Sequence, residues 1–312
     1  MKYVLSVIFI ISLLFLVGYQ QATQHRAQSE KKTTIVTTLY PLYEFSKAVG
    51  GDKVDVTLLL PPGAEAHTFE PKPSDIIKIN NADMFVYIGA GMEPWAHDIV
   101  EGLNNKELTL LDASTKVTLL KSEENGTAEE GHHNHGEYDP HFWLDFNNDM
   151  KVVDAIAETL SLKDPANKDY YLANAKSYKQ KLADLDNKYK QGLNSCKQKE
   201  FITGGHKAYS YLAKRYDIAY LSAFGISPNS EPTPKAIKEI ADLTKEHGIK
   251  YVLFEKLVSP RMAEAIAEQA GAKIMVLNPG SNLMKEEFDQ GVTFISLMEE
   301  NLKTLKVALE CG

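Results

Sequence analysis

A long stretch near the middle of the chain repeats apolar residues with the period of an α-helix. Asp164 and Pro165 are suited to its N-cap and first turn. Beyond them the apolar side chains step by four, three, four, three and four positions, which places them on one helix face. A helix of about 28 residues would be about 42 Å long, more than a single lobe needs. The stretch therefore predicts a rigid helix that joins two lobes. Its apolar positions are Tyr171, Ala175, Tyr178, Leu182, Leu185 and Tyr189.

Short β-branched or apolar runs alternate with helical stretches on both sides of this long helix. Such alternation predicts an α/β fold in which each lobe has a mostly parallel sheet flanked by helices. We expect a first lobe over 33–147, linking helices over 148–195 and a second lobe over 196–312. The last helix is expected to run from Glu286 to Leu309.

Composition excludes several classes of protein. With 312 residues and 44% apolar residues, the chain can build real cores, which excludes global disorder. A formal charge of −8 without a basic stripe argues against nucleic acid as a partner.

Residues 1–32 have the composition of an export segment and linker. Lys2 precedes an apolar run over 3–17 that is short for a membrane span and suited to a signal sequence. We expect export to the periplasm or cell surface, with a retained membrane anchor as the alternative. Leu16-Val17-Gly18 resembles the start of a bacterial lipoprotein box, but Tyr19 stands where the lipidated Cys would be. A lipid anchor is therefore not expected.

The two cysteines, Cys196 and Cys311, flank the second lobe. An exported chain permits a disulfide between them, which would fasten the C-terminus, and two free thiols are the alternative.

Three histidines share one sequence context. His67, His141 and His206 each follow an expected strand or lie in a loop beside Gly or Pro. Ligands of parallel sheets bind beyond the carboxyl ends of the strands, so these three rings can meet between the lobes. Three imidazoles provide most of a tetrahedral zinc site, although each residue alone could be an ordinary loop histidine.

A polar loop over 121–137 precedes His141 and carries three more histidines, His132, His133 and His135. Short His-rich tracts bind metals weakly, so we interpret the loop as an auxiliary metal-collecting segment. The alternative is an incidental polar loop.

Several longer motifs resemble one family, the ZnuA/TroA-like (cluster A-I) solute-binding proteins of zinc and manganese ABC transporters. The resemblance extends from Thr33 to Leu309 and implies two α/β lobes bridged by one long helix, with the metal between them. The family's three histidine ligands fall on His67, His141 and His206, and the His-rich loop is typical of its zinc-specific members. The motifs are Thr38-Leu39-Tyr40-Pro41-Leu42-Tyr43, Pro62-Gly63-Ala64-Glu65-Ala66-His67-Thr68-Phe69-Glu70-Pro71, Asp139-Pro140-His141-Phe142-Trp143-Leu144-Asp145, Gly205-His206 with Ala208-Tyr209, Glu231-Pro232-Thr233-Pro234 and Leu277-Asn278-Pro279.

The fourth ligand departs from the family pattern. Manganese members commonly have an Asp where Asn278 stands, and zinc members place a Glu at the position of Ser281 or of Ala66. Water, Glu65, Glu255 or a loop histidine could complete the site instead. Glu65, Glu255, Asn278 and Ser281 are the candidates for a fourth ligand or for a residue that supports the ligands from behind. The missing carboxylates favour zinc over manganese, which prefers oxygen ligands.

The resemblance implies a monomeric, non-enzymatic zinc-binding component of an ABC importer that delivers Zn²⁺ to a membrane permease. In that role docking on the permease is expected to loosen His206. Three alternatives stay open: a manganese-binding member, a surface adhesin and a secreted zinc hydrolase. The hydrolase is disfavoured because no His-Glu-x-x-His motif is present and Glu255 is the one base that could be nominated.

Overall fold

The computed structural model describes residues 32–122, 137–226 and 233–312, and residues 33–312 form one compact unit. Residues 1–31 of the expected export segment, with Tyr19 among them, lie outside the described residues, as do His132, His133 and His135. Within the described ranges, no helix is both long and apolar enough to cross a lipid bilayer.

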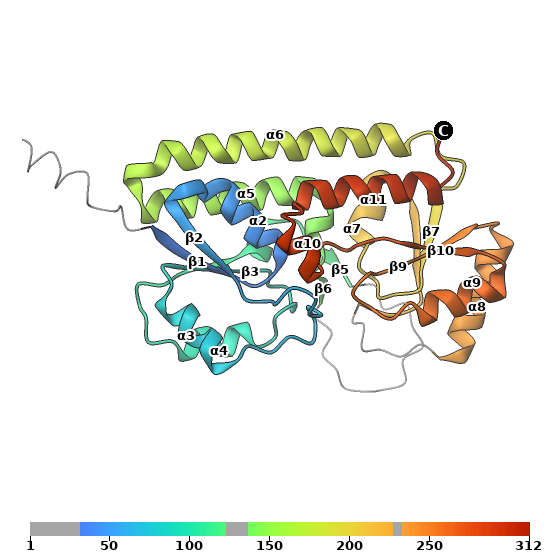
Figure 1. Ribbon diagram of the computed structural model, residues 1–312, viewed down its shortest axis with the longest axis horizontal. Coiled ribbons are helices and arrows are strands. Elements are labelled where there is room, and N and C mark those ends of the chain that lie inside the picture. Colours follow the sequence, from blue (N-terminus) through green and yellow to red (C-terminus); the bar gives the residue numbers. More distant parts are fainter. Residues whose placement is uncertain (1–31, 123–136, 227–232) are drawn as a thin grey trace, which may run out of the picture. The chain divides into compact units, whose positions relative to one another are not determined.

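The first lobe is built on a parallel four-stranded sheet with the order β2-β1-β3-β4. Its alternating side chains face opposite layers: Ile35 packs in the main core, while Val36 packs in a smaller cluster under α3 and α4. The other face is covered by α2 and α5 (Figure 1). The strands are β1 (Thr33–Thr37), β2 (Val54–Leu58), β3 (Met84–Tyr87) and β4 (Thr109–Asp112), and the helices are α2 (Tyr40–Gly50), α3 (Pro73–Asn81), α4 (Ala96–Gly102) and α5 (Phe146–Lys163).

The second lobe repeats this plan with a parallel sheet in the order β10-β9-β7-β8. Ile202 and Val252 pack under α8 and α9, whereas Phe201 and Leu253 face the main core. The predicted α/β class with parallel sheets is therefore confirmed. The strands are β7 (Glu200–Thr203), β8 (Ala219–Ser222), β9 (Tyr251–Phe254) and β10 (Lys273–Val276), and the helices are α7 (Ser210–Tyr216), α8 (Pro234–Glu246) and α9 (Arg261–Ala270).

The long helix α6 (Lys168–Leu193) extends along both lobes (Figure 1). It packs on α2 and α5 of the first lobe, on α7 of the second lobe and on α11. All six apolar positions of the expected face are buried. The helix begins later than predicted, because Pro165–Asn167 forms a separate 3-10 turn. There the Asp164 carboxylate accepts hydrogen bonds from side chains of Asn167 and Tyr171.

The C-terminal region contains two helices where one was expected. The predicted helix from Glu286 to Leu309 is wrong in this respect: α10 (Lys285–Asp289) and α11 (Phe294–Ala308) are separate. Gly291 has a φ of 71°, a left-handed conformation that ends the first helix. Thr293 then starts the second, because its hydroxyl accepts a hydrogen bond from the Ser296 N–H.

Three local features were not predicted. An antiparallel ribbon of β5 (Leu120–Lys121) and β6 (Tyr138–Asp139) forms the base of the His-rich loop, a 3-10 helix covers Phe142–Leu144, and α7 follows His206. In addition, Cys196 and Cys311 are joined by a disulfide, which links the end of the chain to the segment after α6.

Candidate metal centre

His141 lies between the ribbon strand β6 and the 3-10 helix Phe142–Leu144, and its side chain is 1% exposed. One carboxylate oxygen of Asp139 accepts two hydrogen bonds from it: one from the backbone N–H at 2.9 Å and one from ring Nδ1 at 2.8 Å. The segment is fixed on its other side because the Trp143 indole N–H donates to the Pro279 carbonyl at 2.7 Å. The His141 ring is therefore held in one orientation.

His206 follows β7 and is held by the same kind of contact. One oxygen of Glu255, which directly follows β9, accepts from the His206 backbone N–H at 3.1 Å and from ring Nδ1 at 2.7 Å. This close approach depends on Gly205, since a Cβ there would lie 2.3 Å from the same Glu255 oxygen. A residue with a side chain at position 205 would therefore displace the carboxylate that orients the ring.

His67 lies in the long loop between β2 and α3 and is partly exposed, unlike the other two rings. Ahead of His67, residues 61–64 of this loop are hydrogen-bonded to the second half of the chain. There the Asn282 side-chain amide donates to the carbonyls of Pro61 and Ala64 at 2.8 and 2.9 Å, and the Gly63 N–H donates to the Leu283 carbonyl.

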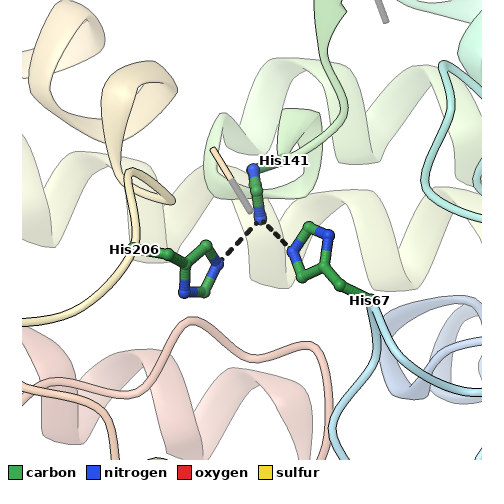
Figure 2. A group of neighbouring side chains, drawn as sticks. All are labelled: His67, His141 and His206. Carbon is green, nitrogen blue, oxygen red and sulfur yellow. Dashed lines mark hydrogen bonds between the residues drawn. The ribbon is translucent and has the colours of Figure 1, made fainter. Parts of the chain in front are cut away.

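The three rings converge, as Figure 2 shows. Nε2 of His141 is 3.2 Å from Nε2 of His67 and 3.1 Å from Nε2 of His206. In a tetrahedral zinc site with Zn–N bonds of 2.0–2.1 Å, neighbouring nitrogens are about 3.3 Å apart. The two distances from His141 fit this spacing, and the ligand atoms of all three histidines lie within 4.8 Å of one another, as one small cation requires.

The hydrogen bonds also decide which ring atoms can bind a metal. An ionised carboxylate only accepts hydrogen bonds, so Nδ1 of His141 and Nδ1 of His206 each carry a proton. In the neutral rings the lone pairs are then on Nε2, and the two lone pairs face each other across 3.1 Å. Facing lone pairs repel unless a proton or a metal ion lies between them. Many zinc ligands are histidines that donate one ring N–H to a carboxylate and bind the metal through the other ring nitrogen.

Electrostatics make His206 more basic. Burial alone lowers the pKa of His206, but the charge and hydrogen bond of Glu255, with smaller contributions from Glu65 and Asp139, raise it above its usual value. Nearby negative charge favours a cation in the site, whether a proton or a metal ion.

The structure separates the candidates for a fourth ligand. Glu255 lies behind His206, so it orients a ligand in this structure. Asn278 is buried, and its side-chain oxygen accepts from the Gly280 N–H at 2.8 Å. Glu65 and Ser281 line a small pocket against His206, and Glu255 lines the same pocket from behind the ring. Among the described residues, the one group of His, Cys, Asp and Glu ligand atoms within 4.8 Å of one another consists of the three histidines.

Sequence reasoning missed Asp139, and it named Glu255 without deciding whether that carboxylate binds the metal or supports a ligand from behind. The position of Asp139, two residues before His141, is a usable signal, because a carboxylate at that spacing can reach both the backbone N–H and Nδ1. No comparable local signal exists for Glu255, which is 49 residues from His206.

Known proteins resemble the chain over most of its length. AdcA of Streptococcus pneumoniae, described as a zinc-binding lipoprotein, is 38% identical over 312 residues, which is 98% of this chain and 61% of AdcA. This chain thus spans about three fifths of that relative. The Zn(II)-bound ZnuA-like domain of AdcA has a TM-score of 0.76 at 37% identity and covers 89% of this chain and 99% of the domain.

Two further relatives are similar over almost their whole length. ZnuA of Bacillus subtilis, described as a high-affinity zinc uptake system protein, is 38% identical over 97% of both chains. The laminin-binding protein Lmb of Streptococcus agalactiae, described as bifunctional with adhesin and metal-transporting activity, has a TM-score of 0.78 at 35% identity and covers 89% of this chain and 99% of Lmb.

The family model of ZnuA, described as the periplasmic component A of the zinc-uptake complex, matches residues 35–308. This match takes in both sheets, the long helix and the three converging histidines. The chain therefore belongs to the ZnuA family.

Proposed function

We propose that this protein is the extracytoplasmic zinc-binding component of an ABC importer, and that it captures Zn²⁺ through His67, His141 and His206. The observation that carries the proposal is the convergence of three Nε2 atoms at the spacing of a zinc site, with two of the rings fixed by carboxylates. The zinc-binding and zinc-uptake roles of AdcA and ZnuA agree with it.

The donor set favours zinc over manganese. Three imidazole nitrogens suit zinc, whereas manganese prefers carboxylate, carbonyl and water oxygens. The remaining coordination position would face the pocket lined by Glu65 and Ser281. Either side chain, or a water molecule beside them, could complete the shell.

The proposed role assigns a task to each part of the chain. Residues 1–32 would direct export, lobes at 33–147 and 196–312 would enclose the metal, and 148–195 would connect them. The protein would act as a monomer that passes zinc to a membrane permease and would catalyse no reaction.

The test is competitive metal loading of the purified protein. Wild-type protein, a triple variant with His67, His141 and His206 replaced by Ala, and a control with exposed His97→Ala are equilibrated with equimolar Zn²⁺ and Mn²⁺ and then analysed for metal. Wild type and the control should each retain one more zinc per chain than the triple variant. Because this readout is a difference, zinc bound elsewhere on the chain does not affect it.

Three results would contradict the proposal. Equal retention of manganese and zinc would exclude a zinc-selective site, and equal zinc in wild type and the triple variant would exclude the histidine cluster as the site. Turnover of esters, amides or phosphates by zinc-loaded protein would contradict a purely transport-related role.

A further inference from the structure

Helix α7 contacts the segment that carries His141 although the two are far apart in the sequence. The helix begins at Ser210, four residues after His206, and it belongs to the second lobe. Tyr211 and Arg215 are four residues apart and therefore lie on the same face of α7. Both are largely buried, and each contacts one end of segment 139–145.

Tyr211 holds the first end of the segment. Its hydroxyl, part of a side chain that is 3% exposed, donates to the Asp139 carbonyl at 2.7 Å and accepts from the Leu120 N–H at 2.8 Å. Leu120 and Asp139 are partners across the β5–β6 ribbon, so one hydroxyl connects both of its strands. Asp139 is also the residue whose carboxylate orients the His141 ring.

Arg215 holds the second end. Its Nη1 donates to the Asp145 carboxylate and its Nε to the Asp186 carboxylate of α6, both at 2.7 Å. The same Asp145 oxygen accepts from the Asn147 N–H and caps α5. The guanidinium thus connects α7, the long helix and the end of the His141 segment, in surroundings largely shielded from solvent.

We propose that α7 is a bracket that keeps the His141 ring at the distance from His206 that a zinc ion requires, with Tyr211 and Arg215 as its two positioning residues. This inference rests on the proposed function. His206 lies just ahead of the bracket and His141 lies between its two contact points, so the two rings form one preassembled pair. His67, on a partly exposed loop, completes the site from outside the pair. Under this proposal His67, rather than His206, is the ligand expected to loosen first.

The simpler explanation is that the Tyr211 hydroxyl only satisfies buried backbone groups. The two explanations differ in one respect. A positioning residue acts through His141, so its effect on zinc binding must vanish when His141 is absent. A contribution to general stability would persist in that background.

The experiment is a double-mutant cycle on the full chain, read out by zinc affinity in chelator competition. Tyr211→Phe removes one hydroxyl and should weaken zinc binding about tenfold, at the lower end of the range for outer partners of metal ligands. In a His141→Ala background the same change should cost less than about twofold. Tyr189→Phe is the matched control: its buried hydroxyl also donates to a backbone carbonyl, that of Met298 on α11, and its loss should leave affinity unchanged.

Asp145→Asn tests the second contact separately. Asn still caps α5, but it removes the charge that pairs with Arg215, so a loss of a few-fold is expected. Cobalt loading gives an independent readout, because the visible d–d bands of Co²⁺ depend on the geometry of its ligands. The bands should change in Tyr211→Phe and remain unchanged in Tyr189→Phe.

The outcomes distinguish a failure of the proposed function from a failure of the bracket alone. A wild-type protein that takes up no zinc would overturn the proposed function and the bracket with it. If wild type binds zinc and Tyr211→Phe matches Tyr189→Phe in both affinity and cobalt spectrum, only the bracket is overturned. An equal cost of Tyr211→Phe with and without His141 would likewise reduce Tyr211 to a structural residue.

Discussion

The two buried histidines of the candidate site differ from the third in how the protein supports them. His141 and His206 are 1% and 4% exposed. Each histidine donates both its Nδ1–H and its backbone N–H to one carboxylate. His67 is partly exposed on a loop whose cross-chain contacts involve residues 61–64. The site therefore consists of a preorganised buried pair and a third, more exposed ring. Binding to a preorganised pair costs less ordering of side chains, so the pair should determine most of the affinity.

The largest expected effect comes from removing one ring of the pair. Nε2 of His141 is within 3.2 Å of Nε2 of both other rings, so His141→Ala removes the central donor and leaves the Asp139 carboxylate without its ring partner. We expect the loss of zinc affinity to exceed roughly 100-fold, the upper end of the range for residues that hydrogen-bond to metal ligands. The loss for His67→Ala should be smaller. Competition with a chelator of known zinc affinity measures both. Equal losses in His141→Ala and His67→Ala would contradict the distinction between the buried pair and His67.

The next effect concerns the carboxylates behind the pair. Glu255→Gln and Asp139→Asn keep the size of each side chain but remove the charge that fixes the ring tautomer, and the Glu255 charge also raises the pKa of His206. Each should weaken zinc binding by roughly 10- to 100-fold. Glu93→Gln is the control, because Glu93 is also buried but accepts from the Ile88 and Gly89 N–H groups. Unchanged affinity in both carboxylate variants would show that the rings are oriented by packing alone.

The sequence was informative wherever a feature repeats or is local. Every fourth or third residue along α6 is buried, as its one-sided apolar pattern predicts. A helix that packs on one side carries the helical period in the sequence spacing of its apolar residues. Both parallel sheets follow from the alternation of short apolar runs with helices. The three histidines could be selected because each occurs beyond a strand or in a loop beside Gly or Pro.

What the sequence could not provide depends on contacts between distant segments. Glu255 was considered as a metal ligand, as a base or as a residue behind the ligands, and the sequence could not choose between these roles. In the structure Gly205 lets it approach the back of the His206 ring. That geometry depends on how β7 and β9 lie side by side. Tyr211 belongs to a helix too short to show a clear period. The break at Gly291 was missed because the apolar residues of α10 and α11 can be read as one helix.

The smallest expected effect is the pH dependence that the pair imposes. Zinc needs the neutral form of His206, and Glu255 raises the pKa of that ring above its usual 6.5, in spite of the opposing effect of burial. As the pH is lowered, zinc affinity should therefore begin to fall while the pH is still above 6.5, by at most about tenfold per pH unit for one ring.

The stability of the metal-free protein should change in the opposite direction. A raised pKa in the folded state means that His206 contributes stability below the unfolded pKa and loses it as the pH rises through the folded pKa. Melting curves with and without zinc from about pH 5.5 to about pH 8.5 measure both trends. Glu255→Gln should shift the loss of affinity to lower pH and flatten the metal-free profile, and an unshifted profile in that variant would show that Glu255 does not control the protonation of His206.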